Sequence, residues 1–191
     1  MNRRSTSAPN WFFAFAVDGA FLLDLVATPP AFRLVHPADA HLTLAFLGAC
    51  GEASALRALD VLDECLLRSP CPVIDISFGE VVAMGSHRRY SALSALVRRG
   101  REAATTCVTA LRDVLTEAAT GQHDPRPAKP HVTIARPLAS ATHADRAAGL
   151  TWAAHIDLRA VDMSLDRIAL YTWSEDRRER MFRIVAERNL G

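Results

Sequence analysis

Apolar residues along the chain fall into short runs that predict strands and longer periodic stretches that predict helices. Residues 11–17 form a continuous aromatic-rich run of strand length, and residues 41–47 have the same length and a similar composition. Between residues 52 and 68, the apolar side chains recur at helical spacing with charged residues opposite them. The residues on this apolar face are Leu56, Leu59, Leu62 and Leu66.

The second half of the chain repeats this alternation of strands with a helix. Residues 102–119 give the clearest helical periodicity, and Gly121 stands where a helix of that length would end. The loop 121–130 contains three prolines, and a short strand follows at 131–135. The other segments are a short helix at 20–27, irregular chain at 31–40, a turn of helix within 138–150, a hairpin tip at 174–180, and strands at 73–82, 90–97, 156–160, 163–172 and 181–187.

These elements predict an α+β fold with an antiparallel sheet, because helices are mixed with hairpin-like strands. No linker divides the predicted elements, so residues 11–191 form one domain and residues 1–10 a loose tail. The chain has 191 residues, of which 50% are hydrophobic, and this is enough for a substantial core.

Charge and cysteine content narrow the class of protein. The formal net charge is +1, which argues against a protein that binds along long nucleic acid through its overall charge. Such a net charge is compatible with the binding of a single phosphate. The apolar run after the N-terminus is too short for a signal peptide or a membrane span. Cysteines 50, 65, 71 and 107 show neither C-x-x-C nor zinc-ligand spacing. We therefore expect four reduced thiols in a cytoplasmic protein that contacts no membrane.

One short motif occurs twice in the chain. Residues 41–45 read HLTLA and residues 131–135 read HVTIA, so both follow the pattern His, apolar, Thr, apolar, Ala. Each copy begins a predicted strand after a proline-containing loop, and no other histidine has threonine two places on. Since residues i and i+2 of a strand share a face, each copy sets an imidazole beside a hydroxyl.

Two such pairs suit metal-independent chemistry at a phosphate ester. One neutral imidazole takes a proton from water, one imidazolium gives a proton to the leaving oxygen, and the hydroxyls bind the non-bridging oxygens. A single H-x-T pair more often marks a half-buried histidine bonded to a neighbour, but two matched copies favour a catalytic role. Neither copy is H-x-H or H-E-x-x-H, so we expect no metal and no cofactor.

The paired motifs, in the segments HLTLAFLG and PHVTIAR, resemble those of the 2H phosphoesterase superfamily. They are most similar to the branch called 2′-5′ RNA ligases or RNA 2′,3′-cyclic phosphodiesterases. This resemblance implies two pseudo-symmetric lobes, each an antiparallel sheet with helices outside and the active-site cleft between them. It implies His41 and His131 as the acid–base pair, Thr43 and Thr133 as phosphate donors, and Arg136 as a cation that faces the phosphate.

The resemblance also implies an enzyme that opens 2′,3′-cyclic phosphates on RNA 3′ ends or small nucleotides to give a 2′-phosphate, with possible reverse ligation. We expect it to be a monomer. Two alternatives remain: a non-catalytic module that binds nucleotides or RNA ends, and a relative that acts on another small cyclic phosphate or a 2′,5′-oligonucleotide. Many relatives carry arginine in place of Ala45, and here residues 174–180 replace a glycine-rich hairpin.

Other residues leave both a functional and a structural interpretation open. The arginines at 98, 99 and 101 and those at 177, 178 and 180 could flank an RNA path or form solvated faces. Trp11, Trp152 and Trp173 could stack a base, although core packing is the default for tryptophan. Lys129 is the only lysine and could attract an anion, but a solvated loop position fits it better. The remaining histidines, expected at the surface or in caps, are His36, His87, His123, His143 and His155.

Overall fold

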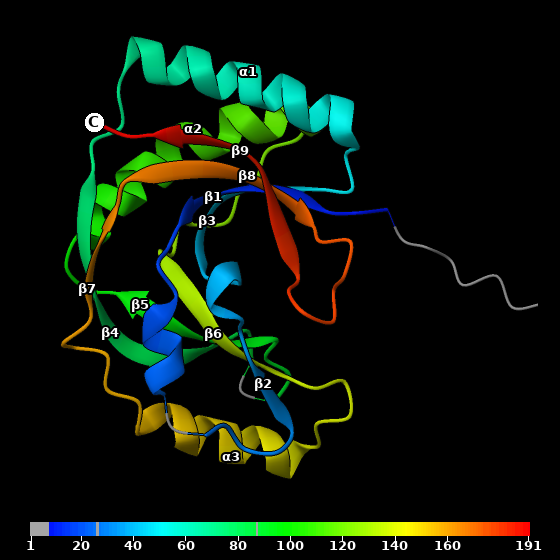
Figure 1. Ribbon diagram of the computed structural model, residues 1–191, viewed down its shortest axis with the longest axis vertical. Coiled ribbons are helices and arrows are strands. Elements are labelled where there is room, and N and C mark those ends of the chain that lie inside the picture. Colours follow the sequence, from blue (N-terminus) through cyan, green and yellow to red (C-terminus); the bar gives the residue numbers. More distant parts are fainter. Residues whose placement is uncertain (1–7, 26, 87) are drawn as a thin grey trace, which may run out of the picture.

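The computed structural model describes residues 8–191 except 26 and 87. Three helices and an antiparallel sheet make up the fold of these residues (Figure 1). The helices are α1 (Glu52–Arg68), α2 (Arg101–Thr120) and α3 (His143–Ala154), with short 3-10 turns η1 (Ala20–Asp24) and η2 (Pro37–Asp39). The strands are β1 (Trp11–Ala16), β2 (Phe32–Leu34), β3 (His41–Gly48), β4 (Ile74–Met84), β5 (Ala92–Val97), β6 (His131–Pro137), β7 (Asp162–Leu165), β8 (Arg167–Trp173) and β9 (Phe182–Asn189).

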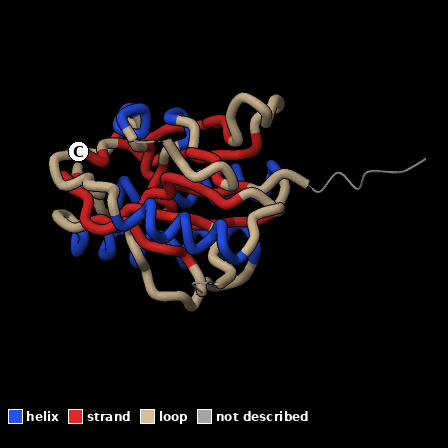
Figure 2. Tube along the Cα trace, turned by 90° about the horizontal axis from the view of Figure 1, so that it is seen from below, coloured by secondary structure: helices blue, strands red, loops and turns tan. Residues whose placement is uncertain are grey.

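The strands form one curled sheet in the order β7-β4-β5-β6-β3-β1-β8-β9, with β2 also paired to β6. Its two halves meet where β3 and β6 pair, with Leu42 opposite Val132. Helices α1 and α2 pack on the half that contains β1 and β3, and α3 packs on β4 and β5. Figure 1 shows these helices at opposite ends of the molecule, and Figure 2 shows α3 lying across the strands. The expected α+β fold is confirmed.

The sequence pattern placed most elements correctly, but several segments differ. Residues 31–40, expected to be irregular, contain β2, which pairs with β6, and the turn η2, and the helix expected at 20–27 is the short 3-10 turn η1. Residues 156–160 are not a strand, because the Asp157 carboxylate accepts hydrogen bonds from the Arg159 backbone and guanidinium and closes a turn. The expected strand 163–172 is split at Asp166 into β7, which pairs with β4, and β8, which pairs with β1. A capping box of Thr142 and Asp145 begins a three-turn helix where one turn was expected.

Strand β1 is buried on both faces, which explains why its sequence shows no polar alternation. Phe13 and Phe15 belong to the large core beneath the helices. Phe12 and Ala14 point to the opposite, concave side, where they form a small second core with Tyr171 of β8. This second core supports the concave face of the sheet, on which the H-x-T motifs lie.

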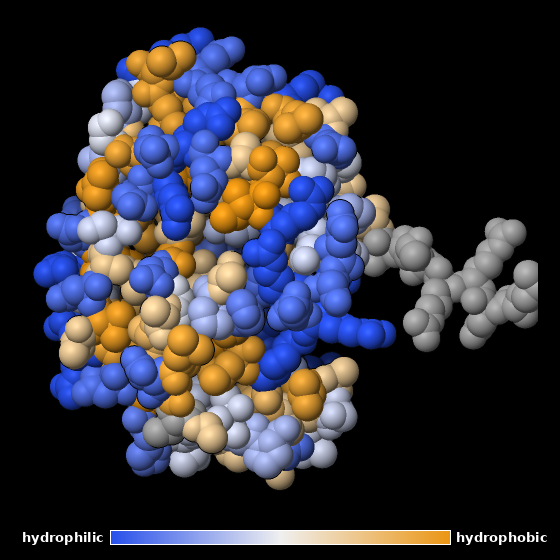
Figure 3. Space-filling view, in the orientation of Figure 1, coloured by the Kyte–Doolittle hydropathy of each residue, from blue (hydrophilic) through white to orange (hydrophobic). Residues whose placement is uncertain are grey.

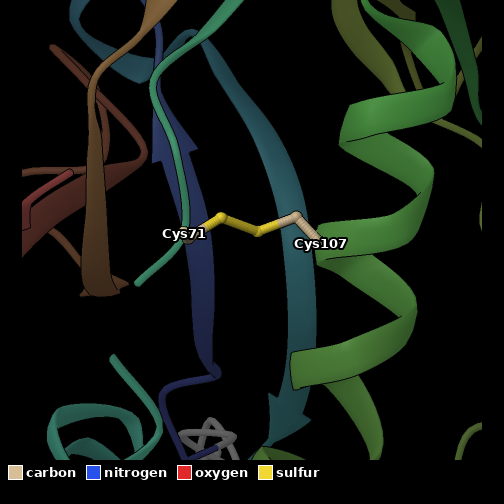
Figure 4. The surroundings of a disulfide bond; sticks show 2 residues. All are labelled: Cys71 and Cys107. Atoms are coloured by element: carbon tan, nitrogen blue, oxygen red, sulfur yellow. A yellow bond between two sulfur atoms is a disulfide. The ribbon is translucent and has the colours of Figure 1, made fainter. Parts of the chain in front are cut away.

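A disulfide joins Cys71, which follows α1, to Cys107 in the middle of α2 (Figure 4). Its Cα atoms lie 6.7 Å apart and both residues are buried. The expectation of four reduced thiols is therefore wrong for this pair, while Cys50 and Cys65 are free. The two cysteines are separated by 36 positions, and only the packing of α1 on α2 brings them together. The cytoplasmic location inferred from reduced thiols stays a prediction.

We expect the Cys71→Ser/Cys107→Ser double variant to be less stable than the parent by about 3 kcal/mol, because the cross-link restricts the unfolded chain. Denaturant unfolding under non-reducing conditions measures this difference. The Cys50→Ser/Cys65→Ser variant removes two free thiols and is the matched control. Equal stability of both double variants would show that the cross-link contributes nothing.

Candidate active site

A cleft of about 650 Å³ opens on the concave side of the sheet, beside the seam between β3 and β6. Its walls come from β2, β3, β6, the segment before β3 and the β8–β9 hairpin. Among the lining residues are His41, Thr43, Thr133 and Arg136, four of the five residues expected at the site. His131, the fifth, is half-buried at the start of β6.

The antiparallel register brings the two motifs together. With Leu42 opposite Val132, the next positions set His41 opposite Thr133 and Thr43 opposite His131. All four side chains then share one face of the sheet, while the two apolar residues point into the core, where both are fully buried. The arrangement is pseudo-symmetric, because each imidazole faces the hydroxyl of the other motif.

Both imidazoles are fixed in the same way. His41 Nδ1 donates to the carbonyl oxygen of Asp39 at 2.6 Å, and His131 Nδ1 donates to that of Lys129 at 2.5 Å. A carbonyl oxygen only accepts, so Nδ1 carries a proton in both rings. The free nitrogen of each ring is therefore Nε2, which is the atom available to take or give a proton.

An aromatic cluster surrounds His41. Its ring centroid lies 4.8 Å from that of Phe12, 5.7 Å from Tyr171 and 5.6 Å from Phe182. Burial among these rings lowers the pKa of His41 from 6.5 to about 4, and the nearby charge of Arg136 acts in the same direction. In the absence of an anion His41 is neutral at physiological pH and is ready to accept a proton.

The pKa of His131 is also lowered, first by burial and then by the positive charges of Lys129 and Arg136. Arg136 thus acts electrostatically on both imidazoles. A bound phosphate would neutralise this cation and favour a proton on one imidazole.

Three polar residues support the site without having been expected from the sequence. Ser94 of β5 is fully buried, and its hydroxyl lies 3.3 Å from the Thr133 hydroxyl. Arg33 of β2 lies directly opposite Arg136 of β6 and lines the cleft. Two like charges in opposed positions repel each other, and an anion between them would relieve that repulsion. Asp39 is the third.

Asp39 is almost fully buried and links the segment before β3 to the start of β9. Its carboxylate oxygens accept the backbone N–H groups of Met181 and Phe182 at 2.6 and 3.0 Å. Its backbone carbonyl holds His41. One residue therefore fixes both an imidazole and the base of the β8–β9 hairpin. The only sequence signal was a carboxylate two places before His41, which gives no hint of a partner more than 140 positions away.

The structure shows which of the arginines and tryptophans with two open interpretations lie at the cleft. Arg177, Arg178 and Arg180 line the cleft, whereas Arg98 and Arg101 line a groove beside α2 and Arg99 pairs with Asp162 at 3.1 Å. Trp11 and Trp152 are buried core residues. Trp173 is half-buried and lines the cleft beside the hairpin.

The other histidines have structural roles or lie at the surface. His36 caps η2 by accepting the Ala38 N–H at 3.1 Å, and His155 Nδ1 contacts a backbone carbonyl at the end of α3. His123 and His143 are exposed, and His87 lies outside the described residues. Lys129 contributes its carbonyl to His131.

The described residues contain neither a cluster of metal ligands nor a membrane-spanning helix. No three or more histidine, cysteine or acidic side chains within residues 8–191, leaving out 26 and 87, gather as metal ligands would. No helix in the described part of the chain is long and apolar enough to cross a membrane.

Solved structures with the same fold come from distant organisms. Escherichia coli LigT in its apo form superposes with a TM-score of 0.66 and 22% identity over 96% of this chain and 99% of that one. TT0787 of Thermus thermophilus gives a TM-score of 0.71 at 18% identity over 95% and 97%. Usb1 of Kluyveromyces marxianus gives 0.55 at 12% identity over 85% and 92%. The curled antiparallel sheet with three outer helices in the described chain is thus a LigT-like fold.

The family follows from the sequence comparison. The model of the 2'-5' RNA ligase superfamily matches residues 27–177, a span that includes both H-x-T motifs and Arg136. The chain belongs to this superfamily of phosphoesterases. No curated protein sequence matches the chain.

We expect the stability of the protein to fall as the pH falls from about 6.5 towards 4. In this interval the unfolded chain binds a proton at His41 that the folded protein excludes, because the folded pKa is about 4 and the ordinary value is 6.5. Urea unfolding at a series of pH values measures the slope.

His41→Asn is the matched variant, since its amide keeps a donor for the Asp39 carbonyl but does not titrate. We expect a flatter pH dependence for this variant than for the parent. An unchanged slope would show that His41 is not the group that excludes the proton.

Proposed function

We propose that this protein hydrolyses 2′,3′-cyclic phosphates, at RNA 3′ ends or on small nucleotides, to a 2′-phosphate without a metal ion. The observation that carries the proposal is the pseudo-symmetric site. Two imidazoles with anchored Nδ1 atoms and two threonine hydroxyls occupy alternating positions on one sheet face. This is the set of groups that the opening of a cyclic phosphodiester needs.

The reaction uses both imidazoles, one as base and one as acid. The neutral one takes a proton at Nε2 from water as the water oxygen bonds to phosphorus. The P–O3′ bond breaks, and the protonated imidazole gives its proton to the 3′-oxygen, which leaves a 3′-hydroxyl and a 2′-phosphate monoester. Thr43, Thr133 and Arg136 bind the non-bridging oxygens as their charge grows. A 5′-hydroxyl that replaces water as the nucleophile would attack the cyclic phosphate in the same way, expel the 3′-oxygen and give a 2′-5′ linkage.

The known complexes of a relative support nucleotides as ligands. E. coli LigT has been solved with 3'-AMP, with ATP, with NADP+ and with phosphate. Each of these ligands contains or is a phosphate group. Guanidinium groups bind phosphate well, and several arginines line the cleft of this protein. Product analysis with a 2′,3′-cyclic-phosphate oligonucleotide in excess EDTA tests the proposal. Tight binding without turnover would instead identify a binding module.

We expect His41→Ala and His131→Ala each to lower kcat by at least roughly 100-fold, because each removes one proton transfer. The double variant should be little worse than the poorer single variant, since the two groups act as a unit. Steady-state hydrolysis of a nucleoside 2′,3′-cyclic phosphate measures the effect. His123→Ala, an exposed histidine away from the cleft, is the control. A folded single variant with nearly full activity would overturn the two-histidine mechanism.

We expect the threonines and the arginine to affect kinetics differently. Thr43→Val and Thr133→Val keep the shape of the side chain but delete a donor, and each should lower kcat by roughly 100-fold or more while KM changes little. Arg136→Ala removes a charge that already meets the substrate anion, so it should raise KM as well as lower kcat.

The same steady-state assay separates these outcomes, and thermal unfolding checks that each variant folds. Because Ser94 loses its partner in Thr133→Val, the Thr133→Ser variant is included, and it should recover much of the activity. Valine variants with unchanged kcat would show that the threonines only pack in the strands.

A further inference from the structure

The hairpin between β8 and β9 forms one wall of the cleft and is rich in arginine. Arg177, Arg178 and Arg180 all line the cleft, together with Trp173 and Phe182 at the base of the hairpin. In the space-filling view, strongly hydrophilic residues gather over this hairpin on the right of the molecule (Figure 3). The hairpin also carries three acidic residues, of which Glu179 lines the cleft and Glu175 and Asp176 do not. The hairpin therefore brings more positive than negative charge to the cavity that contains His41.

These arginines lack the carboxylate partners that many other arginines of the chain have. Within the described residues, no carboxylate oxygen lies within ion-pair distance of Arg33, Arg136 or any of the three hairpin guanidinium groups. The arginines that do form ion pairs are Arg68, Arg99, Arg112, Arg126, Arg159, Arg167 and Arg188. The cleft thus gathers five arginines that have no ion-pair partner among the described residues.

The acidic residues of the cleft are fewer than its arginines and offset only part of this charge. Both oxygens of Asp39 accept backbone N–H groups at the base of the hairpin. Glu179 is the other acidic residue in the lining, and it is exposed. A cluster of cations with so little compensation attracts a polyanion.

The hairpin is held in place rather than free. Besides the bonds from Asp39, the Ser174 N–H donates to the Met181 carbonyl at 2.9 Å and closes the hairpin at its base. The Arg177 guanidinium lies 4.0 Å from the centre of the Trp173 ring, so its plane is already oriented. Little side-chain freedom is lost when such a group binds an anion.

The proposed reaction uses only one of these five arginines. One cyclic phosphate is served by Thr43, Thr133 and Arg136, while the cleft, at about 650 Å³, has room for more than a phosphate group. We propose that Arg177, Arg178 and Arg180 form a second phosphate subsite, which makes the enzyme prefer substrates with a further phosphate beyond the cyclic one. This inference rests on the proposed function and names the substrate class of that site.

The test compares three substrates that differ in phosphate content. A nucleoside 2′,3′-cyclic phosphate has no second phosphate, its 5′-phosphorylated form has a terminal one, and a dinucleotide that ends in a cyclic phosphate has an internucleotide one. We expect the parent protein to show a kcat/KM at least roughly 10-fold higher on one or both of the last two than on the first. The substrate with the higher kcat/KM of these two shows whether the subsite binds a terminal 5′-phosphate or an internucleotide phosphate.

In the combined Arg177→Gln/Arg178→Gln/Arg180→Gln variant, the ratio of kcat/KM on the preferred substrate to kcat/KM on the nucleoside 2′,3′-cyclic phosphate should fall close to one. The matched control is Arg98→Gln/Arg99→Gln/Arg101→Gln, which removes the same charge from exposed positions outside the cleft and should keep the preference. Equal kcat/KM of the parent on all three substrates overturns the inference, even though hydrolysis itself supports the proposed function. An equal loss of preference in both combined variants also overturns it, because bulk charge would then be the cause.

A binding arm keeps the inference testable if the parent hydrolyses none of the substrates. In that case the proposed function fails, and calorimetry compares a nucleoside 2′-monophosphate with its 5′-phosphorylated form. Tighter binding of the second by at least roughly 10-fold, lost in the hairpin variant and kept in the control, supports the subsite. Equal affinity of the two ligands overturns it.

Discussion

The pairing of β3 with β6 is the constraint on which the site depends. These two strands begin with the two H-x-T motifs and join the two halves of the sheet, with Leu42 opposite Val132. A shift of one residue in either strand would turn its histidine and threonine into the core and its buried leucine or valine into the cleft. The burial of those apolar residues therefore fixes the register that sets each imidazole beside the hydroxyl of the other motif.

The two histidines share one anchor but have different surroundings. Each Nδ1 donates to the carbonyl two residues earlier, so the motif repeats its own local geometry. His41 also contacts three aromatic rings of the small second core, whereas the cation of Lys129 acts on His131. Burial lowers both pKa values, and the positive charge of Arg136 acts in the same direction on both. An anion bound beside Arg136 would raise both pKa values, so anion binding and protonation of an imidazole are linked.

The sequence predicted what depends on local pattern and missed what depends on distant pairing. The H-x-T spacing placed His41 and Thr43 on one strand face, because alternation along a strand is a local property. The contribution of Arg33 was not predictable, since residues 31–40 showed no periodicity and β2 is a strand only because it pairs with β6. Ser94 and the Cys71–Cys107 disulfide depend in the same way on partners that only the fold brings near.

Asp39 shows how the catalytic and binding parts of the site are connected. Its carbonyl orients His41, while its carboxylate holds the base of the arginine-rich hairpin. The corresponding residue of the second motif, Lys129, also gives its carbonyl to an imidazole, but among the described residues its side chain has no hydrogen bond to the hairpin. The hairpin can therefore vary in sequence along its tip without disturbing the imidazole, because its attachment runs through backbone N–H groups that every non-proline residue has. This separation permits the arginine content of the hairpin to change while the geometry at His41 is kept.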